Sequence, residues 1–179
     1  MKTYNKNDDI RCYGKNIFTT MDNFFSKLPQ EYSKLYYNNL KSLLLVKCNM
    51  LNNGINTGMY DADNNIIYFT ENNSLGHEMF HVASNDIEKS ILGIDSDTDN
   101  SSALLEGMTE LLFIREYGIS REYAYHFEVM VSKILGQFPD FYKYYFIPNH
   151  DKFINLFNNK DTINSLIDNL NIYHELSDY

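Results

Sequence analysis

The first extended hydrophobic pattern of the chain lies in residues 22–47, where apolar side chains recur every three or four positions. Residues at this spacing share one face of a 3.6-residue repeat, so the pattern predicts helix. Pro29 lies inside the pattern, and a proline cannot continue a helix from its interior. We therefore predict a short helix before Pro29 and a longer helix after it. Residues 1–20 are polar and predict a loosely ordered N-terminal segment.

Residues 60–70 show a different pattern, which is typical of a β-hairpin. A β-branched and aromatic run from Ile66 to Thr70 follows the turn-like residues Asp63, Asn64 and Asn65. Such a run after a turn predicts a strand. It is the strongest strand signal in the chain.

Helical spacing returns after this hairpin. Ser74 can cap a helix over residues 75–83, and the next helix ends at Gly118. A third helix is expected from Ser120 to Gly136. Shorter aromatic-rich helices are expected around residues 138–146, 152–157 and 162–176. The chain thus predicts a mostly helical α+β fold, with a small antiparallel sheet and a helical C-terminal part.

Length and composition narrow the class of protein. The chain has 179 residues, of which 44% are hydrophobic, and residues 21–179 are expected to form one domain. Its net charge of −9 lacks the basic surface that nucleic-acid binding needs. No run of eighteen apolar residues predicts a membrane span, and the polar residues 1–9 lack a signal-peptide pattern. We therefore expect a cytoplasmic protein in which Cys12 and Cys48 are reduced thiols.

Residues 74–84 read SLGHEMFHVAS and contain the motif H-E-x-x-H. His77 and His81 are four residues apart, so both imidazoles lie on one helical face, about 40° apart. Zinc binds neutral imidazole nitrogen at about 2.0–2.1 Å, and two such ligands leave room for a third ligand and a water. Glu78 is one step around the helix, where it can accept a proton from that water as general base.

The third ligand decides the class of metal site. A metzincin would continue H-E-x-x-H-x-x-G-x-x-H, but this chain has Ser84 and Ile87 at the two further positions. The expected helix over residues 103–112 contains Glu106 and Glu110, four residues apart on one face. Carboxylates on a buried face are costly unless a cation lies opposite them, and zinc would be that cation. Either glutamate is a candidate ligand.

In this respect the chain resembles the gluzincin metallopeptidases, in which a glutamate on a second helix completes H-E-x-x-H. The segment Leu105-Glu106-Gly107-Met108-Thr109 is similar to their N-E-G-x-x pattern, with leucine in place of asparagine. The resemblance covers residues 60–118 and implies a small, minigluzincin-like protein with a zincin-like core. It implies that Glu106 is the third zinc ligand. Glu110 matches the position at which thermolysin-like members place an acidic residue that hydrogen-bonds a ligand histidine.

The same resemblance implies an electrophilic tyrosine or histidine that stabilises the oxyanion. Tyr123, Tyr125 and His126 follow the second helix and are the candidates. His150 and His174 are interpreted as surface or locally hydrogen-bonded residues.

The sequence therefore predicts a zinc-dependent peptidase that hydrolyses peptide bonds through a metal-activated water, with Glu78 as general base. The hairpin supplies an edge strand on which an extended peptide substrate can pair. One alternative is a regulatory metalloprotein of a mobile element that resembles anti-repressors, although residues 106–109 do not match their E-x-x-A-like run. Another is a non-catalytic zinc-binding module, which would need a fourth protein ligand.

Overall fold

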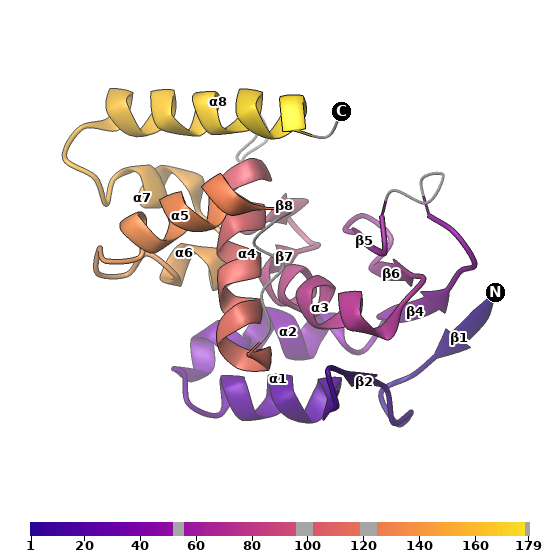
Figure 1. The fold of residues 1–179 in the computed structure, drawn as a ribbon. Helices are drawn as coiled ribbons and strands as arrows, with labels where there is room; N and C mark the ends of the chain where they lie inside the picture. The colour runs from indigo at the N-terminus through magenta and orange to yellow at the C-terminus, as the bar shows by residue number, and fades with distance from the viewer. Residues whose placement is uncertain (52–55, 96–101, 119–124, 178–179) are drawn as a thin grey trace.

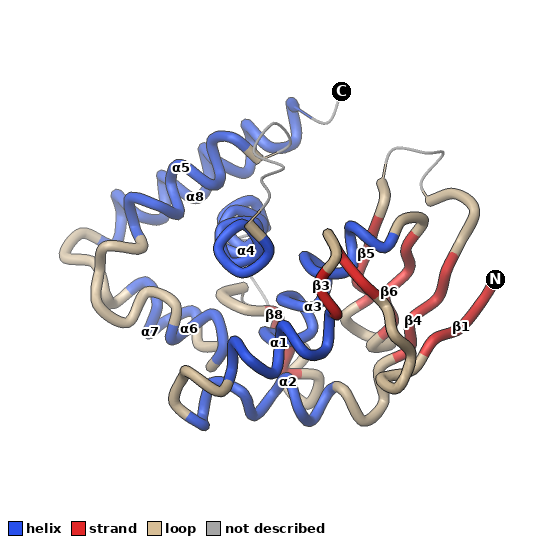
Figure 2. The backbone as a smooth tube through the Cα atoms, turned by 60° about the horizontal axis from the view of Figure 1, so that its bottom comes forward, coloured by secondary structure: helices blue, strands red, loops and turns tan. Residues whose placement is uncertain are grey.

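The computed structural model of the chain is an α+β fold, about 52% helical, with small sheets (Figure 1). It describes residues 1–51, 56–95, 102–118 and 125–177. Helix α3 (Leu75–Ser84) lies between the main sheet and a group of helices that includes α4 (Ser102–Tyr117), α5 (His126–Leu135) and α8 (Lys160–Ser177) (Figures 1 and 2). The other elements are β2 (Arg11–Cys12), β3 (Lys15–Asn16), α1 (Ile17–Phe25), the 3-10 turns Gln30–Ser33 and Asn72–Ser74, β7 (Asn85–Asp86), β8 (Ile91–Leu92), α6 (Lys143–Phe146) and α7 (His150–Ile154).

The main sheet has the strand order β1-β4-β6-β5, formed by β1 (Lys2–Tyr4), β4 (Leu44–Lys47), β6 (Ile66–Phe69) and β5 (Gly58–Asp61). Strands β5 and β6 form the predicted antiparallel hairpin. Strand β4, however, runs parallel to β6, and β1 runs antiparallel to β4. The expected small antiparallel sheet is therefore confirmed only in part, because the main sheet is mixed.

The predicted long helix after Pro29 is wrong in its second half. Helix α2 spans only Lys34–Asn39, and Leu44–Lys47 form β4. Leu45 and Val46 are both buried, and β4 lies between two other strands of the sheet. A short continuous apolar run has the same local signature in a buried helix and in a buried strand, so periodicity alone could not separate them.

The N-terminal residues 1–20 are also more ordered than their polarity suggests. Strand β1 pairs with β4, and β2 pairs with β3. Cys12 is fully buried in the core. Helix α1 begins at Ile17, where the Asn16 side chain caps it by accepting a hydrogen bond of 3.0 Å from the backbone N–H of Thr19. A few apolar residues and two strand pairings are sufficient to order this mostly polar segment.

The predicted helix that contains the motif and the predicted helix after it are confirmed. Helix α3 covers the predicted residues 75–83, and all its residues are buried. Helix α4 ends before Gly118, which has a φ of 79° and whose N–H donates to the carbonyl of Ile114 at 2.8 Å. This is the C-terminal cap expected of a glycine. Helix α5 ends before Gly136 as predicted but begins at His126, and the predicted start at Ser120 lies outside the described residues.

Ser74 does not cap α3 as predicted. Its side chain accepts no hydrogen bond from the first turn of the helix. Instead, its hydroxyl donates to the carbonyls of Thr57 at 2.8 Å and Glu71 at 2.9 Å. Ser74 thereby connects the start of α3 to the residue that precedes β5.

Aromatic side chains fill the core between α1, α3 and α6. The ring centroids of Phe24 and Phe80 are 5.3 Å apart in an edge-to-face arrangement, and those of Phe25 and Phe146 are 5.5 Å apart in the same arrangement. This packing fixes α3 on the side that carries Phe80. The motif face is therefore held in one orientation.

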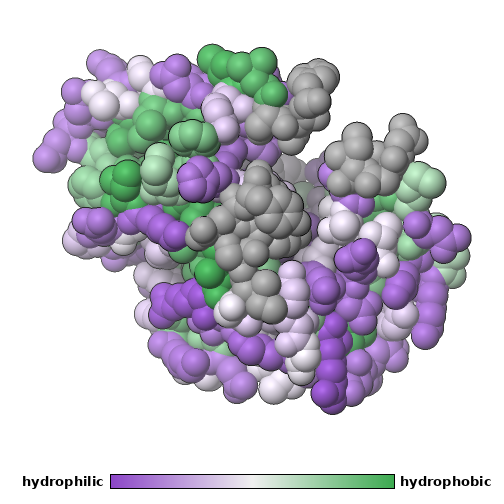
Figure 3. Space-filling view, viewed as in Figure 1, coloured by the Kyte–Doolittle hydropathy of each residue, from purple (hydrophilic) through white to green (hydrophobic). Residues whose placement is uncertain are grey.

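Apolar side chains are exposed along α5 and α8, where Figure 3 shows hydrophobic surface, while the surface over the sheet is more polar. The larger ones include Phe127, Met130, Ile134, Tyr173 and Leu176. Of the helices that the structure describes, none combines the length and the apolar character needed to cross a bilayer.

Candidate metal centre

Helix α3 presents both motif histidines on one face. His77 and His81 are 2% and 4% exposed, and their Nε2 atoms lie 3.2 Å apart. The four-residue spacing therefore has the effect that the sequence predicts, because both ring nitrogens converge on one point.

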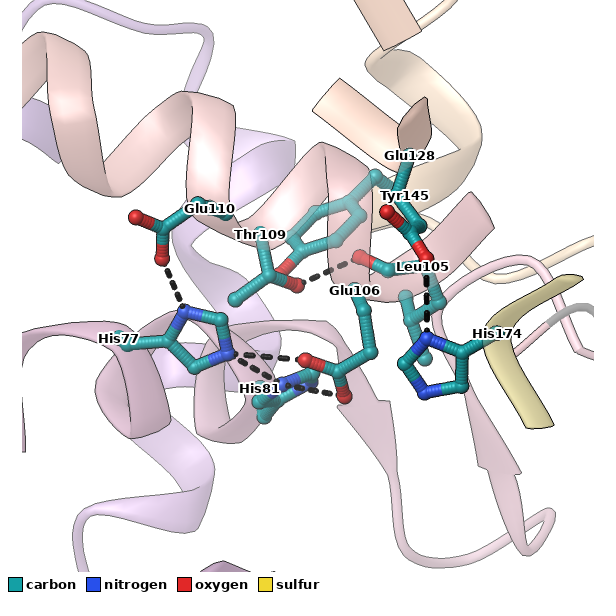
Figure 4. A network of polar contacts seen from close by, with 9 residues as sticks. All are labelled: His77, His81, Leu105, Glu106, Thr109, Glu110, Glu128, Tyr145 and His174. Atoms are coloured by element: carbon teal, nitrogen blue, oxygen red, sulfur yellow. Dashed lines mark hydrogen bonds and ion pairs between the residues drawn. The ribbon is translucent and has the colours of Figure 1, made fainter. Parts of the chain in front are cut away.

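Helix α4 brings Glu106 against both histidines (Figure 4). Its Oε2 atom lies 3.0 Å from Nε2 of His77, and its Oε1 atom lies 3.2 Å from Nε2 of His81. The ligand atoms of the three residues all lie within 4.8 Å of one another. The Glu106 side chain is 24% exposed, so solvent can reach one side of this cluster.

The donor atoms of this cluster fit a zinc ion. Two donors bound at 2.0–2.1 Å to a tetrahedral ion lie about 3.3 Å apart, and the contacts of this cluster measure 3.0–3.2 Å. Because Nδ1 of His77 faces a second carboxylate, it carries the ring hydrogen in the neutral form, and Nε2 is then an acceptor. When both Nε2 atoms are deprotonated, two imidazole nitrogens and one carboxylate would surround the cation as ligands.

Glu110 lies one turn after Glu106 and is fully buried. Its Oε2 atom is 2.9 Å from Nδ1 of His77, the ring nitrogen that does not face the other donors. Between the two candidate glutamates, it is therefore Glu106 whose oxygens join the three-residue cluster. Glu110 has the position of an outer partner that orients a ligand ring. Nδ1 of His81, in contrast, is buried without a hydrogen-bond partner among the described residues.

The charges of this cluster shift its protonation equilibria. Burial by itself lowers the pKa of His77, but hydrogen bonds with Glu106 and Glu110 raise it to about 9. Burial raises the pKa of Glu106, but the nearby charge of His81 and its hydrogen bonds with both histidines bring it well below the usual value. The cluster thus favours a cation between its carboxylates, which in the absence of metal is the His77 imidazolium.

Glu78 is 7% exposed and lies next to the start of β5. A methyl group at Gly58 would come within 2.7 Å of Oε1 of Glu78. The carboxylate thus lies beside the backbone of the edge strand. Its negative charge is also one of the influences that raise the pKa of His77.

Of the three residues proposed as oxyanion stabilisers, the two that the structure describes lie in different places. The Tyr125 ring is stacked with that of His77, with centroids 5.6 Å apart and an interplanar angle of 13°. His126 is exposed, and its ring contacts Phe127 instead. Tyr123 lies outside the described residues. Of the two candidates that the structure describes, Tyr125 is therefore the one that contacts a residue of the candidate metal cluster.

His174 lies near the cluster although its sequence context gives no such indication. It extends from α8, forms a hydrogen bond of 3.0 Å with Glu128, and stacks with Tyr125 at a centroid distance of 6.2 Å. Its hydrogen-bond partner is 46 residues away in the sequence, so the interpretation as a surface or locally hydrogen-bonded residue is wrong, and its place beside Tyr125 depends on how α8 packs. His150 hydrogen-bonds the backbone carbonyl of Ile94 at 2.8 Å.

Comparison with models of known protein families, with curated proteins and with solved structures finds no match to this chain.

Proposed function

We propose that this chain is a zinc-dependent peptidase of the gluzincin type. The single observation that carries the proposal is the convergence of His77, His81 and Glu106, with separations of 3.0–3.2 Å that suit tetrahedral zinc. A structural zinc site would be closed by four protein ligands, whereas the cluster found among the described residues has three. A catalytic site needs the open position that this leaves.

A zinc ion held by these residues would supply Lewis acidity, which polarises a peptide carbonyl and acidifies water. Glu78 would accept the proton from the attacking water and pass it to the leaving amine. The motif places this carboxylate next to His77 in sequence but outside the ligand cluster. His77 is oriented for binding by its hydrogen bond of 2.9 Å with Glu110.

The substrate in this proposal is an extended peptide. Strand β5 is at the end of the strand order of the main sheet, and Gly58 at its start approaches the Glu78 carboxylate. A peptide that pairs with this edge would therefore pass the general base.

Replacement of the general base tests the mechanism. Glu78→Gln keeps the shape of the side chain but cannot accept the proton, so we expect kcat/KM to fall at least about 100-fold while zinc binding is retained. Hydrolysis is measured on a mixture of quenched fluorescent peptides, before and after treatment with a chelator. Glu71→Gln, an exposed glutamate seven residues earlier, is the matched control and keeps full activity. If zinc-loaded wild-type protein cleaves no peptide, or if Glu78→Gln is as active as the wild type, the proposal is wrong.

A further inference from the structure

The His77 ring is restrained in its plane and also across its face. Its hydrogen bonds with Glu106 and Glu110, at 3.0 and 2.9 Å, both lie along the ring plane. Such bonds resist sliding of the ring but resist tilting only weakly. The Tyr125 ring, nearly parallel to that of His77 at 13°, packs against the ring face and opposes this tilt.

Tyr125 is in turn stacked with a residue of the C-terminal helix. The rings of Tyr125 and His174 are inclined by only 14°, and their centroids are 6.2 Å apart. Nδ1 of His174 lies 3.0 Å from Oε1 of Glu128, a residue that is 1% exposed. This contact with a buried side chain defines the orientation of the His174 ring.

Glu128 lies where α5 crosses α4. A Cβ atom at Gly107 would collide with the backbone carbonyl of Glu128, so the two helices touch at this glycine. Gly107 directly follows Glu106. The crossing that positions Glu106 therefore also positions Glu128, and through it His174 and Tyr125.

A chain of contacts thus leads from His77 on α3 to Tyr125, and from Tyr125 to His174 on α8. His174 contacts Glu128 on α5, and α5 packs on α4, whose Glu106 contacts His77 again. We propose that Tyr125 and His174 are positioning residues that hold His77 for metal binding, so that zinc affinity depends on the docking of α8. The dependence is reciprocal, because a ligand that binds more tightly to the docked state stabilises docking by the same factor. This inference rests on the metal centre of the proposed function but not on peptide hydrolysis.

Zinc affinity of single variants tests the proposal directly. Competition with a chromogenic chelator measures the zinc dissociation constant of the full chain. We expect His174→Ala to weaken zinc binding about tenfold, as is typical for loss of an outer partner of a metal ligand. Tyr125→Leu should have a similar effect, while Tyr125→Phe keeps the ring and retains wild-type affinity. Ile172→Ala is the matched control on α8, since this side chain is 57% exposed, and it should retain zinc affinity within about twofold.

Hydrogen exchange of the wild-type protein tests the reciprocal effect without any substitution. We expect added zinc to slow exchange of the backbone amides of α8. The proposal is overturned if zinc leaves this exchange unchanged, or if His174→Ala and Ile172→Ala have the same zinc affinity. A wild-type protein that binds no zinc would overturn both this inference and the proposed function. Zinc binding without peptide hydrolysis would overturn the proposed function alone.

Discussion

At the scale of single residues, the place of the Glu78 carboxylate depends on a glycine in strand β5. A Cβ atom at Gly58 would lie 2.7 Å from Oε1 of Glu78 and 2.7 Å from Cβ of Ser74. Both distances are shorter than real Cβ atoms tolerate. The carboxylate can therefore lie beside the strand because residue 58 has no side chain.

We predict that Gly58→Ala displaces the Glu78 carboxylate and lowers kcat/KM by about 10- to 100-fold, because small displacements of a catalytic group have effects of this size. Zinc affinity should stay close to wild type, since residue 58 does not contact the ligand cluster. The two quantities are measured on the same preparation. Met59→Ala, a change at a partly exposed position of the same strand, is the control. Wild-type kcat/KM in Gly58→Ala would contradict this role of the glycine.

At the scale of elements, the C-terminal end of α3 is held by the last residue of α2. The buried Asn39 amide donates to the carbonyls of Val82 at 2.8 Å and Asn85 at 2.7 Å. Carbonyl groups in the last turn of a helix lack partners within the helix, and a side chain can satisfy them. Asn85 continues the network by donating from its own amide to Tyr60 at 2.8 Å. The helix that carries the motif is thus connected to α2 and to the hairpin.

We predict that Asn39→Ala destabilises the protein, because it leaves two buried carbonyl groups without this donor. Each carbonyl group that loses its donor should lower the free energy of unfolding by about 1–3 kcal/mol. Urea denaturation followed by circular dichroism measures the change in the free energy of unfolding. Asn38→Ala, at the exposed neighbouring position, should change it by less than about 0.5 kcal/mol. Equal stabilities of the two variants would show that the Asn39 amide does not hold α3.

At the scale of the whole molecule, the candidate metal centre joins the part of the fold that contains the sheet to the helical part. Helix α3 packs against the hairpin, and α4 packs against α5 and α8. Buried charges at this junction make the stability of the metal-free protein depend on pH. The pKa of His77 is raised from 6.5 to about 9, and that of Glu106 is lowered from 4.5.

The sign of this dependence differs between the two groups. A raised histidine pKa stabilises the fold fully below the unfolded value of 6.5, and the contribution is lost as the pH rises through about 9. A lowered glutamate pKa stabilises the fold above 4.5, and this contribution is lost as the pH falls through the folded value. We therefore predict that chelator-treated protein loses stability between pH 6.5 and 9. Urea denaturation at pH 6.5 and 9 measures this, and a flat or rising profile would contradict it.

Zinc loading should reverse this trend, because the metal takes the place of the His77 proton. Zinc affinity is expected to rise over the same pH interval. His77→Ala should remove the dependence that the metal-free protein shows. These measurements separate the metal cluster from the other titrating groups of the chain.

The elements that local sequence pattern determines are those of the motif region. Four-residue spacing sets His77 and His81 on one face of a helix whatever that helix packs against, and Gly118 ends the next helix through its own backbone freedom. The hairpin of β5 and β6 follows in the same way from a β-branched run after a turn. Periodicity and turn chemistry act over a few residues, so a sequence is sufficient to predict them.

Tertiary structure decided the features that depend on distant residues. The run at residues 44–47 became a strand because β1 and β6 were available to pair with it. The packing of α4 on α3 separated the position of Glu106 from that of Glu110. His174 reaches Tyr125 through the docking of α8, almost fifty residues further along the chain. Such contacts arise from packing between elements, which no local pattern encodes.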